Sequence, residues 1–150
     1  MRVAALYDVH GNLPALEAVL ADPRCHATPR SDEEIVTRLT PDDAVAAAFA
    51  GSSWITIIGH THVQFDRRLG HFRAVNAGSV GSPYEGRSGA FWALLHDDVE
   101  LVHTDYDAAR AAETIRATGF RFADDLASTL LEPATAEEAT EFFEAQRRGA

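Results

Sequence analysis

The run Trp54-Ile55-Thr56-Ile57-Ile58 leads directly into Gly59-His60-Thr61-His62, so an apolar segment stops at a glycine and two histidines. β-branched and aromatic residues favour a strand, and a glycine among polar residues ends it. A second apolar run, residues 3–7, stops in the same way at Asp8-Val9-His10-Gly11-Asn12. The sequence therefore predicts two buried strands that each end in side chains able to bind a metal ion.

The pairs Asp8/His10 and His60/His62 share one spacing. Residues i and i+2 of an extended chain point to the same side, so each pair can address one point in space. Ligands of open α/β sheets bind beyond the carboxyl ends of the strands, where the two pairs are expected to meet. Either pair alone is more typical of ordinary surface residues. Together, a carboxylate and three imidazoles predict a site for Zn, Mn, Fe, Co or Ni.

Apolar periodicity and turn residues predict the other elements. The middle of the chain is expected to form antiparallel strands over residues 63–69, 72–76, 90–95 and 99–106. Helices are expected over residues 13–21, from residue 107, over residues 122–131 and from residue 135. Five large aromatic residues at core-like spacing are expected to pack in the interior: Trp54, Phe91, Trp92, Phe142 and Phe143.

Capping signals mark the starts of three helices. Ser31-x-x-Glu34 has the form of a capping box, and Thr40-Pro41 stands before two acidic residues as a cap and an N1 proline would. These signals predict two short consecutive helices. Thr135 and Glu138 form a further capping box at the start of the final helix.

The composition limits the partners. The chain has 150 residues and a formal net charge of −10, and its 13 basic residues are all arginine. Such a surface repels a nucleic-acid backbone, so nucleic-acid binding is not expected. The single Cys25 excludes an intramolecular disulfide and a site of several thiolates. No apolar run suffices for a signal segment or a membrane span, so we expect a soluble cytoplasmic protein.

Four short motifs follow one another along the chain. They are Asp8-Val9-His10-Gly11-Asn12, Cys25-His26-Ala27-Thr28-Pro29-Arg30, Gly59-His60-Thr61-His62 and Asn76-Ala77-Gly78-Ser79-Val80-Gly81. These motifs resemble those of the calcineurin-like metallophosphoesterases, in the small bacterial YfcE-like phosphodiesterase subgroup. The resemblance implies a sandwich in which a mixed sheet faces an antiparallel sheet, with helices outside.

The resemblance implies two metal ions, whose ligands carry the catalysis. In the family, the residues matching Asp8, His10 and His62 hold the first metal, and those matching His26 and His60 hold the second. A hydroxide between the metals would attack phosphorus, because metal ions lower the pKa of bound water and neutralise the phosphate oxygens. The expected cofactor is a divalent transition metal: Mn, Fe, Ni or Zn. The implied substrate is a phosphoester small molecule, contacted by Asn12, Asn76 and Ser79.

The sequence departs from the family between Asn12 and Cys25. In this region the family has a G-D motif, whose Asp bridges the metals, and a G-N-H motif, whose Asn binds the second metal. This chain has neither motif. We therefore expect a single domain over residues 1–150 with an internal deletion near residues 24–25. The first metal site keeps three ligands, whereas the second keeps only His26 and His60 and is expected to bind weakly.

The predicted fold class is α/β, a reduced metallophosphoesterase-like β-sandwich flanked by helices. Missing strands should expose sheet edges, so a homo-oligomer is expected. The leading function is a metal-dependent phosphoesterase, a hydrolase whose activity is reduced by the missing motifs. Two alternatives stay open: a catalytically inactive metal- or phosphate-binding module that acts through a protein partner, and an internally deleted product of an incomplete gene model.

Overall fold

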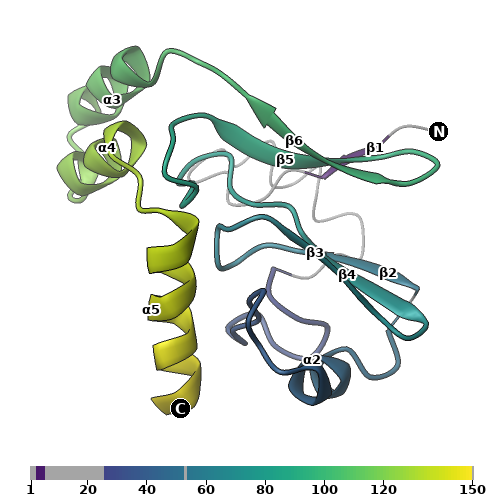
Figure 1. Ribbon diagram of the computed structural model, residues 1–150. Helices are drawn as coiled ribbons and strands as arrows, with labels where there is room; N and C mark the ends of the chain where they lie inside the picture. The colour runs from purple at the N-terminus through teal and green to yellow at the C-terminus, as the bar shows by residue number, and fades with distance from the viewer. Residues whose placement is uncertain (1–2, 6–25, 53, 150) are drawn as a thin grey trace.

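Two three-stranded sheets lie one above the other in the centre of the molecule (Figure 1). They are seen in a computed structural model that describes residues 3–5, 26–52 and 54–149. Several predicted features lie outside the described residues: Asp8, His10, Asn12, Cys25 and the helix over residues 13–21.

The sheet drawn uppermost in Figure 1 has the order β1-β5-β6 and is antiparallel throughout. Its strands are β1 (Val3–Ala5), β5 (Ala90–Leu95) and β6 (Val99–Thr104). β5 and β6 form the predicted hairpin, in which Leu95 pairs with Val99. The described part of the first apolar run, residues 3–5, thus joins the antiparallel sheet, with Val3 opposite Leu95, and not the sheet that carries the histidines.

The second sheet has the order β2-β4-β3 and is mixed. Its strands are β2 (Ile55–Ile58), β3 (Phe65–Leu69) and β4 (Phe72–Asn76). β3 and β4 form a tight antiparallel hairpin around Gly70, whose φ of 59° lies in the left-handed region that favours glycine. β2 runs parallel to β4 with Ile58 opposite Asn76, so both strands end at the same edge of the sheet.

Apolar side chains fill the space on both faces of the mixed sheet. The cluster between the two sheets contains Ile57, Val75, Ala77 and Ala93. The cluster on the outer face, beneath helix α2 (Asp42–Ala48), contains Val36, Val45, Ala48, Phe49, Ile58, Phe65 and Ala74. A mixed sheet that faces an antiparallel sheet, with a helix outside, confirms the predicted fold class.

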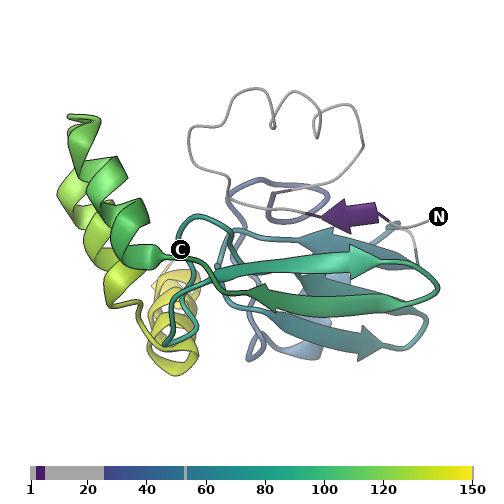
Figure 2. The ribbon, with the colours of Figure 1, turned by 90° about the horizontal axis from the view of Figure 1, so that it is seen from above.

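Three further helices lie to one side of the sandwich, as Figure 2 shows from above. α3 (Ala108–Ala117) and α4 (Ala123–Leu131) pack against each other, and α5 (Ala136–Gly149) runs beside the mixed sheet. The predicted capping box of α5 is confirmed, because the backbone N–H of Thr135 donates to the Glu138 carboxylate and that of Glu138 donates to the Thr135 hydroxyl. Within the ranges described above, no helix has the length and apolar character needed to cross a membrane.

The helix predicted after Ser31 is wrong. Residues 32–41 form turns and irregular backbone. The Ser31 hydroxyl accepts a hydrogen bond from the backbone N–H of Glu33, and the Glu34 carboxylate accepts from the side chains of Thr28 and Arg30. Charge-assisted hydrogen bonds are stronger than neutral ones, so the Glu34 carboxylate pairs with the Arg30 guanidinium and the capping box does not form.

Two of the five aromatic residues expected in the interior lie at the surface. Trp54 is 67% exposed just before β2, and Phe142 is 59% exposed on α5, whereas Phe91 is 2% exposed as predicted. Adjacent residues of a helix point in different directions, so Phe142 and Phe143 cannot both face the sandwich. Exposed apolar side chains are compatible with self-association, which stays a prediction.

Arg73 connects the two sheets. The residue is buried on β4, and its guanidinium donates to the carboxylate of Asp66 on β3 at 2.7 and 2.6 Å and to that of Asp98 in the turn between β5 and β6. Bidentate arginine–carboxylate pairs fix geometry as well as adding binding energy. One side chain therefore holds the turn end of the β5–β6 hairpin against the β3–β4 hairpin.

A buried carboxylate fixes α5 to the sandwich. The Glu144 carboxylate accepts from the hydroxyls of Thr37 and Thr40 at 2.7 and 2.6 Å and from Arg147 Nε at 2.9 Å. Burial alone would raise the pKa of Glu144, but the hydrogen bonds from Arg147, Thr40 and Thr37 outweigh it and lower the pKa to about 2. Thr40 is predicted to cap α2, but its hydroxyl donates to Glu144 of α5 instead. Pro41 takes the N-cap position of α2.

Replacing Glu144 with glutamine should change how stability depends on pH. A folded-state pKa of about 2, against the usual 4.5, means that the Glu144 carboxylate stabilises the fold fully above about pH 5 and loses this effect as the pH falls toward 2. We expect Glu144→Gln to lower the free energy of unfolding at pH 7 by about 2 kcal/mol, with the difference from the wild type shrinking below pH 4. Urea unfolding at pH 7, 5, 4 and 3 measures this.

Glu141→Gln is the matched control, because Glu141 is exposed on the same helix. Its effect on the free energy of unfolding should stay within about 0.5 kcal/mol at pH 7. A Glu144→Gln deficit that is the same at pH 7 and pH 3 would contradict the role of the ionised carboxylate.

Candidate functional site

The two histidines that follow β2 lie in an uncommon backbone conformation. His60 has a φ of 66° and His62 a φ of 55°, both in the left-handed region. This conformation costs a residue other than glycine about 1–3 kcal/mol and persists only where the surroundings hold it. Such strain is concentrated at functional turns, so it marks residues 59–62 as a candidate site.

One buried amide holds this turn. Asn76 Nδ2 donates to the Gly59 carbonyl at 2.6 Å and to Thr61 Oγ1 at 3.0 Å, and Asn76 Oδ1 accepts from the Gly78 backbone N–H at 2.9 Å. The amide reaches the turn because β2 and β4 are parallel and end together. The backbone of both histidines is thus fastened from the end of the neighbouring strand.

Backbone carbonyls set the orientation of two imidazole rings. His62 Nδ1 lies 2.7 Å from the Ser82 carbonyl oxygen, and His26 Nδ1 lies 2.9 Å from that of Asp32. A carbonyl only accepts, so Nδ1 carries the proton in both rings and the lone pair of the neutral imidazole is on Nε2. Metal-binding histidines are typically oriented by such a bond from the other ring nitrogen.

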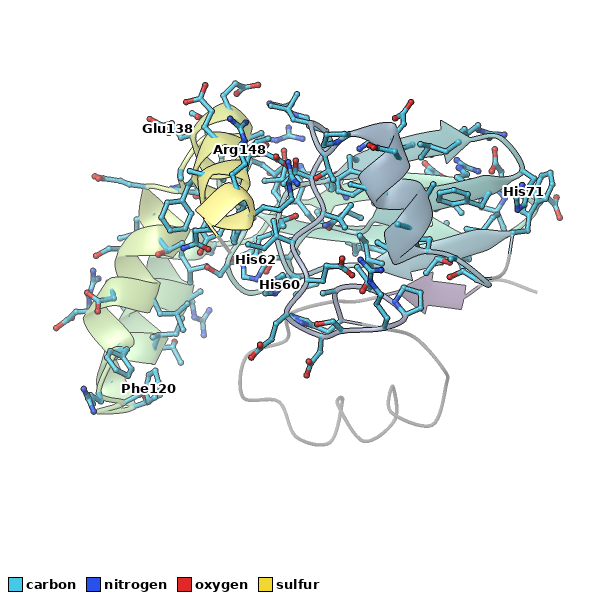
Figure 3. The ribbon with its side chains drawn as sticks, turned by 90° about the horizontal axis from the view of Figure 1, so that it is seen from below. His60, His62, His71, Phe120, Glu138 and Arg148 are labelled. Atoms are coloured by element: carbon cyan, nitrogen blue, oxygen red, sulfur yellow. The ribbon has the colours of Figure 1, made fainter. Side chains whose placement is uncertain are left out.

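The structure brings His26 next to His60. The backbone N–H of Gly59 donates to the His26 carbonyl at 2.8 Å, and the His26 and His60 ring centroids lie 4.8 Å apart in an edge-to-face arrangement. His60 and His62 lie between α5 and the sheets in Figure 3. The histidine of the second sequence motif therefore meets the histidine turn, as expected from the resemblance.

Two aromatic rings flank the histidines. Tyr84 stacks on His62 with ring centroids 5.0 Å apart, and Phe143 of α5 lies 6.2 Å from His60. Tyr84 is also tied to the turn by its backbone N–H, which donates to the His62 carbonyl. Tyr84 belongs to none of the four sequence motifs, and the spacing of Phe143 predicts only that it packs. No sequence signal marks either contact, because both arise from the docking of distant segments.

The other predicted site residues fall into two groups. Asp8, His10 and Asn12 lie outside the described residues. Asn76 and Ser79, predicted to contact substrate, are fully buried, and the Ser79 hydroxyl accepts from the backbone N–H of Ser82, the residue whose carbonyl orients His62. Both side chains support the histidine turn, and their contact with substrate stays a prediction.

The described donors are suitable for a transition metal but do not complete a site. Imidazole nitrogen suits Zn, Fe, Ni and Cu, and the orientation of His26 and His62 through Nδ1 is that of metal ligands. Across residues 3–5, 26–52 and 54–149, no group of three or more His, Cys, Asp or Glu side chains is arranged to hold a metal ion. A complete set needs a donor from the rest of the chain, where Asp8 and His10 are found.

The fold resembles that of solved metallophosphoesterases. A metallophosphoesterase from Sphaerobacter thermophilus matches 72% of this chain and 54% of its own with a TM-score of 0.58 and 22% identity. A hypothetical protein from Pyrococcus horikoshii OT3 matches 74% of this chain and 46% of its own, with a TM-score of 0.61 and 18% identity. The chain spans about half the length of these two proteins. No family model and no curated protein matches its sequence.

Removing the Asn76 amide should loosen the histidine turn. Asn76→Ala removes three hydrogen bonds, those to the Gly59 carbonyl, the Thr61 hydroxyl and the Gly78 N–H, and leaves the Gly59 carbonyl only its bond from the Thr61 backbone N–H. This loss should lower the free energy of unfolding by about 2–3 kcal/mol. Thr61→Val removes only one of these bonds and should cost about 1 kcal/mol. Chemical denaturation measures both values. Equal costs for the two variants would contradict the central role of the amide.

Proposed function

We propose that the chain is a metal-dependent phosphoesterase, a hydrolase of phosphodiester or phosphomonoester small molecules. The observation that carries this proposal is the strained histidine turn, fastened by Asn76 and placed against His26 on a metallophosphoesterase-like fold. Maintaining two histidines in the left-handed region opposes folding, so the arrangement is better explained by a functional need than by packing.

The proposed ligands are Asp8, His10 and His62 for one metal and His26 with His60 for a second, weaker site. When bound, the metal would lower the pKa of a water molecule and neutralise phosphate oxygens. The chain's own contribution is to fix the rings: the Ser82 and Asp32 carbonyls hold the Nδ1 protons of His62 and His26, so Nε2 is the donor atom of each. Mn, Fe, Ni and Zn are the proposed metals.

A second candidate function is a catalytically inactive module that binds a metal or phosphate and acts through a protein partner. The specific observation in its favour is in the sequence, which lacks both the G-D motif of a bridging carboxylate and the G-N-H motif. Without a bridging carboxylate, the pair His26 and His60 should hold a metal weakly. The two functions differ in turnover rather than in metal binding at His62.

Replacing His62 with alanine should remove the metal. We expect the purified wild-type chain to retain Mn²⁺ or a related metal after dialysis, and His62→Ala to lose most of it, because a first site reduced to Asp8 and His10 binds far more weakly. His71→Ala is the matched control, since His71 is exposed in the turn between β3 and β4, far from His60 and His62 in Figure 3. Elemental analysis of metal per chain measures both.

Hydrolysis of bis-p-nitrophenyl phosphate in added Mn²⁺, assayed on the same samples, separates the two functions. Turnover by the wild type and by His71→Ala, with at least a hundredfold loss in His62→Ala, is expected of the phosphoesterase. Metal binding without turnover in any sample would favour the inactive module. Full metal occupancy in His62→Ala would overturn the ligand assignment itself.

A further inference from the structure

An open apolar pocket lies beside the histidine turn. Its volume is about 310 Å³, and its lining consists of Tyr84, Ala134, Glu138, Ala139, Phe142 and Phe143. Ligand pockets range upward from about 300 Å³, so this one suits a single ring rather than a large molecule. Three of the six lining residues are aromatic, and their rings are well suited to stack against a planar group.

Two aromatic residues of the pocket lining also contact the histidines. Tyr84 lines the pocket and stacks on His62, and Phe143 lines the pocket and lies 6.2 Å from His60. The two shared rings have centroids 6.4 Å apart. A ligand in the pocket would therefore contact the same two rings that contact the histidines.

The charge of the lining excludes phosphate from the pocket itself. Among the described residues, Glu138 is the one carboxylate in the lining; it accepts hydrogen bonds from the backbone N–H and the hydroxyl of Thr135, and these bonds lower its pKa. No arginine or histidine is among the lining residues. An anion would meet a like charge there, whereas an uncharged ring would meet apolar surface.

The exposure of Phe142 supports the same assignment. Phe142 is 59% exposed, although its ring packs edge-to-face on Phe143 at 5.6 Å. A ring bound in the pocket would cover part of this apolar surface and so gain binding energy.

We propose that this pocket binds the aromatic ring of an aryl phosphoester whose phosphate group lies at His60 and His62. The inference rests on the proposed function, because it takes the phosphate to be held by the metal-bearing histidines. It adds the substrate class: esters with an aromatic group in place of a small alkyl group.

Binding of two phosphonates tests the inference without relying on turnover, since aryl and alkyl esters differ in intrinsic reactivity. Calorimetric titration of the full chain in Mn²⁺ with phenylphosphonate and methylphosphonate compares ligands that differ only in the ring. We expect the wild type to prefer phenylphosphonate by about tenfold, from the apolar area that the ring buries. Phe142→Ala should reduce the preference to about threefold or less and leave the affinity for methylphosphonate unchanged.

Phe120→Ala is the matched control. Phe120 is 56% exposed and packs edge-to-face on Phe122 at 5.7 Å, as Phe142 does on Phe143, but it lies far from His60 and His62 in Figure 3. This variant should keep the full preference for phenylphosphonate.

The outcomes distinguish the inference from the proposed function. Equal affinity of the wild type for both phosphonates would overturn the inference and leave the phosphoesterase proposal standing. Failure of both ligands to bind would overturn both. A change of molar mass in Phe142→Ala by light scattering, with the phenyl preference intact, would assign Phe142 to contact with a second copy and also overturn the inference.

Discussion

The hydrogen bonds of the Asn76 amide are the constraint on which the rest of the site depends. The amide lies at the end of β4, and the parallel pairing with β2 places it against the Gly59 carbonyl and the Thr61 hydroxyl. A buried amide with all these partners satisfied can offset the cost of two left-handed residues. The positions of the two histidines are therefore a consequence of sheet topology as much as of their own sequence.

Polar side chains, rather than apolar area, align the parts around this centre. Arg73 joins the two sheets through Asp66 and Asp98, and Glu144 joins α5 to the threonines at 37 and 40. Arg73 and Glu144 are both buried and paired, which is the condition for a buried charge to be tolerated. Hydrogen bonds are directional, so the bonds of Glu144 fix the position of α5 and its aromatic residues more closely than apolar contact would.

The sequence predicted much of the fold because the local signals agreed with the tertiary structure. The runs at 72–76 and 90–95 became β4 and β5 with the expected limits, and the Thr135 capping box formed. The Ser31 helix failed because Glu34 found a stronger partner in Arg30. For the site, the motif indicated His60 and His62, but the supporting amide, the rings of Tyr84 and Phe143 and the pocket arise from contacts between distant segments, which no local pattern encodes.

The histidines and the pocket lie on separate elements, and this separation bears on how such a protein can diverge. The histidine turn is enclosed by buried hydrogen bonds and tolerates little change. Phe142 sits at the surface of α5, where substitutions usually have small effects on stability. A lineage can thus exchange residues on the outer face of one helix and reshape the pocket while inheriting the same histidine turn intact.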